Sequence, residues 1–344
     1  MLRRCHYLWI IIVLLFATSG AVYAQAPVRI RLGTLAPRGT SYHQILLQMA
    51  EKWRQAPHGG VTLTIYTDGI MGGEAEMVRR MRVGQLQAAM LTVPGLSEID
   101  KSIAALQEMP MMFSTYDELE YVRARLRADI EQRFLKNGFV ILFLGDSGWA
   151  HFFSRTPATH PADFKKLKIF AWANDNHQIE LMKAAGYQPV PLEFTDTLTG
   201  LQTGLIDAVP TVPVYALAGQ YYGALKHMLD VKWVPLVGGI VVTKKAWDAL
   251  PADTRESSMR SAQEAGQLMQ TRSRQESIEA IEAMKKLGVH VHPVPLELER
   301  EWREMADQLY PKIRGTIVPA GTFDAVQKLV AEYREDNAKG SKAK

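Results

Sequence analysis

Stretches in which apolar and polar residues alternate recur along the chain, and stretches with helical spacing separate them. Residues 28–32 and 61–65 alternate with period two, which predicts strands with one buried face. Residues 43–54 between them place apolar side chains three and four positions apart, as in an amphipathic helix. A second helix is predicted to begin after Gly73 and to stop at Gly84. This repeated order predicts parallel strands with helices on both faces of the sheet.

The sequence GDSGW, residues 145–149, follows the continuously apolar run 139–144. Such a run predicts a central strand that is buried on both faces and ends at Gly145. Because ligands bind at the carboxyl ends of strands in open α/β sheets, we expect a binding site here. GDSG also surrounds the nucleophile of chymotrypsin-like proteases, but no upstream histidine has the required setting and Trp149 replaces the glycine that should follow. The pattern therefore disfavours a protease.

A second α/β set follows, with a strand predicted over 167–172, a helix over about 178–185 and a short helix that ends at Gly204. Residues 252–287 contain one glycine and no proline, which predicts a helix about 50 Å long. A helix of that length exceeds the width of one domain, so we expect it to bridge two lobes of an α/β fold. The small and charged residues 337–344 are expected to fray.

The first 24 residues differ in character from the rest of the chain. Arg3 and Arg4 precede an apolar run, and Val22-Tyr23-Ala24 matches the pattern that signal peptidase accepts. The run is shorter than the ~20 residues that span a bilayer, so a cleaved signal peptide, residues 1–24, is favoured over a membrane anchor. The sequence thus predicts export to the periplasm and a mature protein that begins at Gln25.

Removal of this segment changes the chemistry available to the mature chain. The only cysteine, Cys5, is lost, so no disulfide or cysteine metal site remains. The formal charge falls from +4 to +2, because 38 Lys and Arg then stand against 36 acids. A charge so close to balance argues against nucleic acid or an anionic membrane as partner.

Motifs for catalysis, cofactors and metals are missing from the sequence. There is no G-x-S-x-G elbow, H-E-x-x-H, P-loop or G-x-G-x-x-G. His290 and His292 share one side of a predicted strand, where an exposed pair is more common than a metal site. An exported two-lobed α/β chain with no catalytic set indicates a binding protein, with no cofactor and no metal.

Seven segments, in the expected order, resemble the extracytoplasmic solute-binding proteins of TRAP transporters, the DctP type, over essentially the whole mature chain. They are Leu32-Gly33; Gly72-Gly73-Glu74 with Gly84-Gln85-Leu86; Met109–Phe113; Pro157–Lys168; Gly186–Pro191 with Phe194; Leu201–Asp207; and Trp247–Pro251. The resemblance implies two lobes that close on a ligand and a helix that spans both. It also implies delivery of the ligand to a membrane permease with one small and one large subunit, driven by an ion gradient.

The chain departs from this family where the family holds an organic acid. The family's G-x-R reads Gly148-Trp149-Ala150 here, and its K-[IL]-R, which supplies the main salt bridge, reads Lys168-Ile169-Phe170. The family's D-G-x-E-N-P has become 207–212, and Trp233 aligns with a common histidine. An arginine grips a carboxylate with two hydrogen bonds, which phenylalanine and alanine cannot make.

These substitutions predict the character of the pocket. The predicted aromatic walls are Trp149, Phe170, Trp172, Phe194 and Trp233, and the predicted polar groups are Glu74, Thr92 and Thr211. A buried carboxylate without a cation costs several kcal/mol. We therefore expect an apolar or aromatic solute, such as a hydrophobic acid or a lipid-like molecule, and not a C4-dicarboxylate. Lys168 points to the same strand face as Phe170 and could replace the missing arginine.

The expected division of the chain follows from these elements. We expect lobe I to contain 25–147 and about 236–270, lobe II to contain 148–235 and about 271–330, and 331–344 to form a tail, with hinges at 146–148 and 235–238. Three other functions stay open: a periplasmic carrier or sensor component that works without a permease, an exported hydrolase that uses Ser147, and a scaffold that dimerises through the long helix. The sequence leaves open whether the protein is a monomer or a dimer.

Overall fold

The computed structural model describes residues 28–173 and 175–342; the predicted signal peptide lies outside these residues. Its strands form one nine-stranded sheet in the order β2-β1-β3-β8-β4-β7-β5-β6, with β9 paired to β8. The strands are β1 Val28–Thr34, β2 Val61–Tyr66, β3 Ala88–Thr92, β4 Phe139–Ser154, β5 Lys168–Trp172, β6 Gln188–Leu192, β7 Ala208–Thr211, β8 His227–Thr243 and β9 His290–His292.

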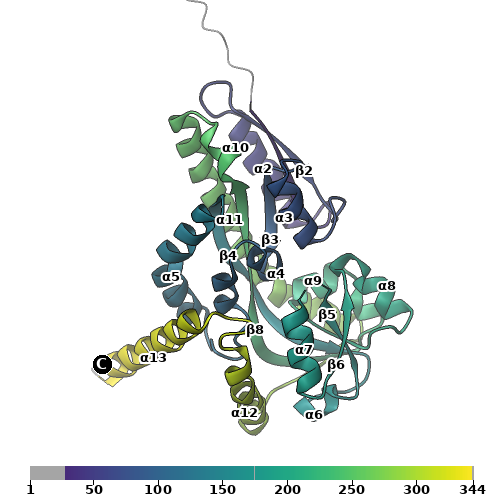
Figure 1. Cartoon of the computed structure of the whole chain (residues 1–344). Coiled ribbons are helices and arrows are strands. Elements are labelled where there is room, and N and C mark those ends of the chain that lie inside the picture. The colour runs from purple at the N-terminus through teal and green to yellow at the C-terminus, as the bar shows by residue number, and fades with distance from the viewer. Residues whose placement is uncertain (1–27, 174, 343–344) are drawn as a thin grey trace, which may run out of the picture.

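Helices cover both faces of this sheet (Figure 1). They are α2 Ser41–Arg54, α3 Glu74–Arg82, α4 Val93–Ser97, α5 Tyr116–Lys136, α6 Pro161–Phe164, α7 Asn176–Ala184, α8 Thr197–Gln202, α9 Pro213–Ala218, α10 Lys244–Asp248, α11 Ala252–Lys286, α12 Leu296–Ile313 and α13 Ala320–Lys342, with 3-10 turns η1 Lys101–Leu106, η2 Phe194–Asp196 and η3 Tyr221–Gly223. The predicted α/β class, the strands at both ends of α2 and the helix that follows Gly73 are confirmed. In the described residues no helix is both long and apolar enough to cross a membrane.

Two strands, β4 and β8, run the length of the sheet and divide it into two lobes. The first lobe contains β1, β2 and β3, beside residues 238–243 of β8 and, next to these, 139–145 of β4. The second lobe contains β5, β6 and β7, beside residues 151–154 of β4. The pairing of β4 with β8 shifts register between Asp146 and Trp149, at the crossing between lobes. The crossing lies where the sequence places the hinges, and the exact domain bounds stay a prediction.

The prediction that the strand ends at Gly145 is wrong, because β4 continues through GDSGW to Ser154. Gly148 has a φ of 106°, a conformation that glycine adopts without strain, and this residue lies inside the register shift. In the sequence, the polar residues Asp146 and Ser147 indicated the end of a strand, whereas they lie at an irregularity inside β4. The prediction of parallel strands holds for β1, β2 and β3 and for β5, β6 and β7, but β4 and β8 are antiparallel because the chain crosses between lobes and returns.

The long helix α11 spans both lobes, as predicted. Near its start Trp53 donates its indole N–H to the Ser258 carbonyl at 3.0 Å, and Met269 belongs to the apolar core of the first lobe. Further along, Ala280 and Met284 are buried in the core of the second lobe. One rigid element thus connects the two cores.

The C-terminal segment differs from the prediction. Phe323, Val326 and Val330 of α13 pack with Leu119 and Val122 of α5, so these residues join the first lobe and not the second. The residues expected to fray are helical through Lys342. Figure 1 shows α13 extending outward from the body of the molecule. Amphipathic spacing beyond Ala320, and not composition alone, explains why this segment is a helix.

Candidate ligand-binding cavity

A cavity of about 540 Å³ lies between the two lobes. Residues of β1, β3 and α2 line it from the first lobe, residues of β5, β7 and α9 from the second, and residues of β4, β8 and α11 at the crossing. Pockets that hold drug-sized molecules have volumes of roughly 300–1,000 Å³. A four-carbon diacid would leave much of this space to water.

The two lobes touch at one rim of the cavity. A Cβ atom on Gly73 would lie 2.2 Å from Oε2 of Glu193, and one on Gly69 would lie 2.8 Å from Cγ2 of Thr195. Gly69 also has a φ of 66°. The turn of the first lobe that precedes α3 therefore needs glycine to approach the second lobe this closely.

Six of the eight predicted site residues line the cavity: Glu74, Thr92, Phe170, Trp172, Phe194 and Thr211. Trp149 lies outside it, buried in the first-lobe core and stacked on Tyr116 with ring centroids 5.3 Å apart. Trp233 also lies outside it and packs on Phe152 and Trp302. The role of all eight residues in ligand binding stays a prediction.

Aromatic rings form one wall of the cavity. Trp172 stacks on Phe194 with centroids 5.6 Å apart and an interplanar angle of 12°, and Phe170 meets Trp172 edge to face at 5.7 Å. Phe194 meets the ring of Tyr215 edge to face at 6.1 Å. These four rings come from β5, η2 and α9 of the second lobe. They give this wall a largely apolar, aromatic surface.

Tyr42, Ser147 and Tyr215 join the lobes at the crossing. The Tyr42 hydroxyl donates to Ser147 Oγ at 2.8 Å, and Ser147 Oγ lies 3.4 Å from the Tyr215 hydroxyl. Burial raises the pKa of Tyr42 and Tyr215, so both stay neutral hydrogen-bonding groups. Within the described residues, the hydrogen-bonding partners of Ser147 Oγ are these two tyrosine hydroxyls.

Glu74 is held by three hydrogen bonds at the edge of the cavity. Its carboxylate accepts from the Thr92 backbone N–H at 2.8 Å, the Thr92 hydroxyl at 2.8 Å and the Gly95 N–H at 2.9 Å. Only 5% of Glu74 is exposed, and this burial raises its pKa to about 7 against the pull of the three donors. Glu74 thus connects the start of α3 to the junction of β3 and α4, and near neutral pH it is only partly ionised.

Among the described residues that line the cavity there is no lysine, arginine or histidine, whereas four acids are present: Glu74, Asp146, Glu276 and Glu279. The negative charge of Asp146 is balanced by two arginines that do not line the cavity. Arg274 Nη2 lies 2.6 Å and Arg123 Nη1 lies 3.6 Å from its carboxylate. The cavity therefore lacks a cation that could hold an organic acid.

The positions that carry arginine in the resembled family point to the same conclusion. Phe170 lines the large cavity, and Ala150 lines a second, smaller cavity of about 140 Å³ that shares the Phe170 and Trp172 walls. Lys168, the suggested substitute, bonds instead to the Gly204 carbonyl and lies 3.7 Å from Asp207. It does not line either cavity.

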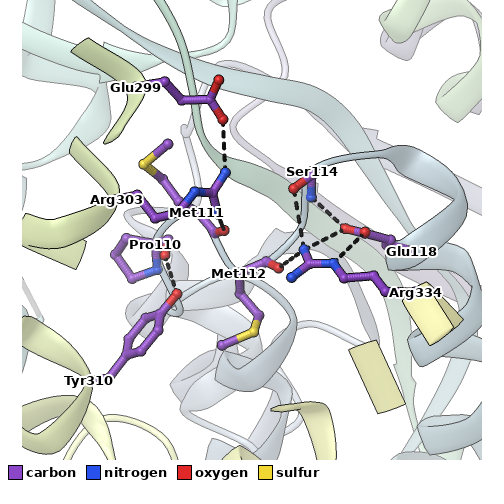
Figure 2. A network of polar contacts seen from close by, with 9 residues as sticks. All are labelled: Pro110, Met111, Met112, Ser114, Glu118, Glu299, Arg303, Tyr310 and Arg334. Atoms are coloured by element: carbon purple, nitrogen blue, oxygen red, sulfur yellow. Dashed lines mark hydrogen bonds and ion pairs between the residues drawn. The ribbon is translucent and has the colours of Figure 1, made fainter. Parts of the chain in front are cut away.

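The loop that follows η1 forms part of the second cavity and is fixed by the last two helices. Figure 2 shows side chains of α12 and α13 bonded to backbone groups of this loop. Tyr310 donates to the Pro110 carbonyl at 2.6 Å, Arg303 to the Met111 carbonyl at 3.2 Å and Arg334 to the Met112 carbonyl at 3.0 Å. Arg334 also pairs with Glu118 at 2.7 Å. The loop keeps Pro110 at the cavity wall even though Met111 has a φ of 54°.

Several residues of the cavity were not predictable from the sequence. Tyr42, Tyr215, Glu276 and Glu279 lie on helices from both lobes, and each becomes part of the cavity only when the lobes are packed together. Their helical spacing could have assigned the side of each helix, but not its neighbour in the other lobe. His290 and His292 share β9 as expected, and His292 Nε2 lies 3.0 Å from His227 Nδ1, remote from the cavity lining.

A mixed sheet in two lobes, two connecting strands, a helix through both cores and a ligand-sized cavity between them define the two-lobed solute-binding proteins. The family model described as bacterial extracellular solute-binding protein, family 7 (DctP), matches residues 32–315. The chain belongs to this family. The resemblance to the TRAP solute-binding proteins is thereby confirmed.

Individual relatives agree with this assignment. The chain is 24% identical over 287 residues to the C4-dicarboxylate-binding periplasmic protein DctP of Rhodobacter capsulatus, which covers 83% of this chain and 85% of that protein. It is 25% identical over 298 residues to the 2,3-diketo-L-gulonate-binding periplasmic protein YiaO of Escherichia coli, covering 84% and 88%. A TRAP periplasmic solute-binding protein from Shewanella oneidensis, solved with bound succinate, matches with a TM-score of 0.81 at 18% identity and covers 89% of this chain and 100% of that one. The shared fold is therefore that of the TRAP binding proteins.

Proposed function

We propose that this protein captures an apolar or aromatic solute between its lobes and presents it to a TRAP-type permease with one small and one large membrane subunit. In this proposal the protein works in the periplasm after removal of residues 1–24 and carries out no catalysis. Family membership supports the transport role. Ligand contacts to both lobes would shift the population toward the closed form by hinge motion at the β4 and β8 crossing.

The observation that carries the proposed ligand class is the cavity wall itself. The wall contains the rings of Phe170, Trp172 and Phe194 and, among the described residues, no cation. A dicarboxylate in this cavity would lose its hydration without gaining an ion pair, which costs several kcal/mol. The two relatives are named for binding C4-dicarboxylate and 2,3-diketo-L-gulonate, which are polar acids. In this proposal, the chain shares their fold but binds a different class of ligand.

Isothermal titration calorimetry on the mature protein tests this proposal. Succinate, malate and 2,3-diketo-L-gulonate should give no tight binding, whereas aromatic and long-chain aliphatic probes should give saturable heats. Apolar burial should also give a negative heat-capacity change on binding. Tight binding of succinate or malate would contradict the proposed ligand class and leave the transport role in place.

A further inference from the structure

Two carboxylates on one side of α11 face the cavity without a cationic partner. Glu276 and Glu279 lie three positions apart, which places them on the same helix face. Glu276 accepts a hydrogen bond from the Ser41 hydroxyl at 2.7 Å, and Glu279 accepts one from Gln275 at 2.8 Å. No ion pair in the described part of the chain includes either residue. Among the described residues, each carboxylate is therefore hydrogen-bonded by a neutral side chain and not paired with a cation.

The other acids of the cavity do not change this balance. Asp146 is neutralised by Arg274 and Arg123 from behind the wall. Glu74 is buried among three donors and contributes partial negative charge at neutral pH, since burial raises its pKa to about 7. An anionic ligand would thus meet net negative charge, and a cationic ligand would be attracted by the half-buried Glu276 and the exposed Glu279.

The aromatic wall also favours a positively charged ligand. The faces of aromatic rings carry negative potential, and they attract an ammonium group within about 6 Å of the ring centroid. Trp172, the ring type that binds cations best, stacks on Phe194 and lines the cavity with the Tyr215 ring next to Phe194. Carboxylates and aromatic faces in one cavity are the combination that recognises an organic ammonium ion.

We infer that the solute is an organic cation: an amine or quaternary ammonium group attached to an apolar or aromatic body. The ammonium group lies against Glu276 and Glu279, and the body lies on the wall of Phe170, Trp172 and Phe194. This inference rests on the proposed function, because it assumes that the cavity is the ligand site, and it narrows the ligand class by charge. It replaces a hydrophobic acid as the expected ligand with a hydrophobic base.

The experiment compares ligands that differ only in the charge of one group. Phenethylamine, 2-phenylethanol and phenylacetate form one set, and tryptamine, tryptophol and indole-3-acetate form a second. Calorimetric Kd values at low and high salt are expected to follow the order amine, alcohol, acid, with the amine at least about tenfold tighter than the alcohol at low salt. High salt should reduce this preference because it screens exposed charges.

Three variants test whether these two residues cause the preference for amines: Glu276→Gln, Glu279→Gln and the double variant. The double variant should lose about tenfold in amine affinity and keep its alcohol affinity. Glu282→Gln is the matched control on the same helix, because Glu282 pairs with Lys285 at 2.7 Å and does not line the cavity. Glu279→Gln alone removes an exposed carboxylate, so it tests the inference even if the change at Glu276 weakens the contact to Ser41 and the folded state.

The outcomes separate the inference from the proposed function. Acids that bind as tightly as the matched amines, or an amine preference that survives in the double variant, would overturn the organic cation while leaving the apolar solute in place. Binding of succinate with none of the aromatic probes would overturn the proposed apolar or aromatic ligand class, on which the inference rests, and leave the transport role in place. Loss of stability in Glu276→Gln with an unchanged amine preference would assign that residue a structural role at the start of α2.

Discussion

Carboxylates are paired with arginine at the crossing between the lobes, but not at the cavity wall next to it. At the crossing, the buried carboxylate of Asp146 accepts hydrogen bonds from Nε and Nη2 of Arg274 at 3.0 and 2.6 Å. At the cavity wall, Glu276 and Glu279 have no such partner within the described residues, and Phe170 stands where the resembled family carries arginine. Arg274 pairs with a protein carboxylate at the crossing, and no arginine is among the described residues that line the cavity. In our proposal, the chain keeps the fold of its family without the cations that would hold an acid.

Placing an arginine at the cavity wall should have the largest effect on stability and on succinate binding. Phe170→Arg places a charge at a position that is 4% exposed and packed in the second-lobe core. The free energy of unfolding should fall by several kcal/mol without ligand. Succinate should then raise the Tm of the variant and not that of the wild type, as measured by differential scanning calorimetry. Phe170→Leu is the control, since it changes the ring without adding a cation; succinate stabilisation of the wild type would contradict the account.

Removal of the arginine at the crossing should have the next largest effect. Arg274→Ala leaves the carboxylate of Asp146, whose side chain is fully buried, with Arg123 at 3.6 Å as its remaining cation. Breaking a buried ion pair costs roughly 3–5 kcal/mol. Urea unfolding should show this loss, whereas Arg260→Ala on the same helix, which breaks an exposed pair with Glu256, should cost less than about 1 kcal/mol. Equal losses in the two variants would mean that the crossing does not depend on this pair.

The pH dependence of stability tests the buried carboxylate of Glu74 at the edge of the cavity. Burial raises the pKa of Glu74 to about 7 from its usual 4.5, so the folded protein binds a proton that the unfolded chain has lost. The stabilisation that this group gives is complete below about pH 4.5 and is lost as the pH rises through 7, by on the order of 3 kcal/mol. Urea unfolding at pH 5 and pH 8 should therefore show the wild type losing stability relative to Glu74→Gln.

Glu76 provides the control for that measurement. Arg79 and Arg80 lower its pKa to about 2, so it stays ionised over this range in both folded and unfolded chains. The difference between wild type and Glu76→Gln should therefore be the same at pH 5 and pH 8. If the difference for Glu74→Gln were also constant, Glu74 would be ionised in the folded protein at pH 5.

The arginine that fixes the loop of residues 110–114 should give the smallest effect. Arg334→Ala removes two hydrogen bonds to Glu118, one to the Met112 carbonyl and one to the Ser114 hydroxyl (Figure 2). Because Arg334 is 45% exposed, the loss should be roughly 1–2 kcal/mol. Hydrogen exchange of the loop amides should become faster. Arg314→Ala, which breaks an exposed pair with Asp324, should change neither stability nor loop exchange; similar exchange in both variants would assign the loop's order to other contacts.

The sequence predicted those parts of the fold that depend on local periodicity. The strand at 28–34, the helix before β2 and the 35-residue helix α11 each bury one regular face, and that pattern is visible without tertiary information. The continuation of β4 beyond Gly145 was not predictable in this way. It depends on pairing with β8 in both lobes, while the local residues Asp146 and Ser147 resemble a turn.

The site shows the same limit. Phe170 was predicted because it occupies the position of an arginine in the resembled family. Trp172 lies two positions further along the same strand, and both residues line the cavity. Trp149 follows a register shift, so simple alternation does not give its direction, and its ring lies in the core against Tyr116. Tyr42 and Tyr215 meet across the lobes at 5.8 Å between ring centroids, and no local pattern records that meeting. Contacts between lobes are the part of the site that sequence periodicity leaves out.

Mass spectrometry of the small molecules released by denaturing the purified mature protein tests the central claim most directly. The cavity of about 540 Å³, with its aromatic wall and without a cation among its described lining residues, predicts a co-purified apolar or aromatic compound. A released C4-dicarboxylate or sugar acid, bound in proportion to the protein, would contradict the account. That result would mean that a cation from elsewhere supplies the missing charge.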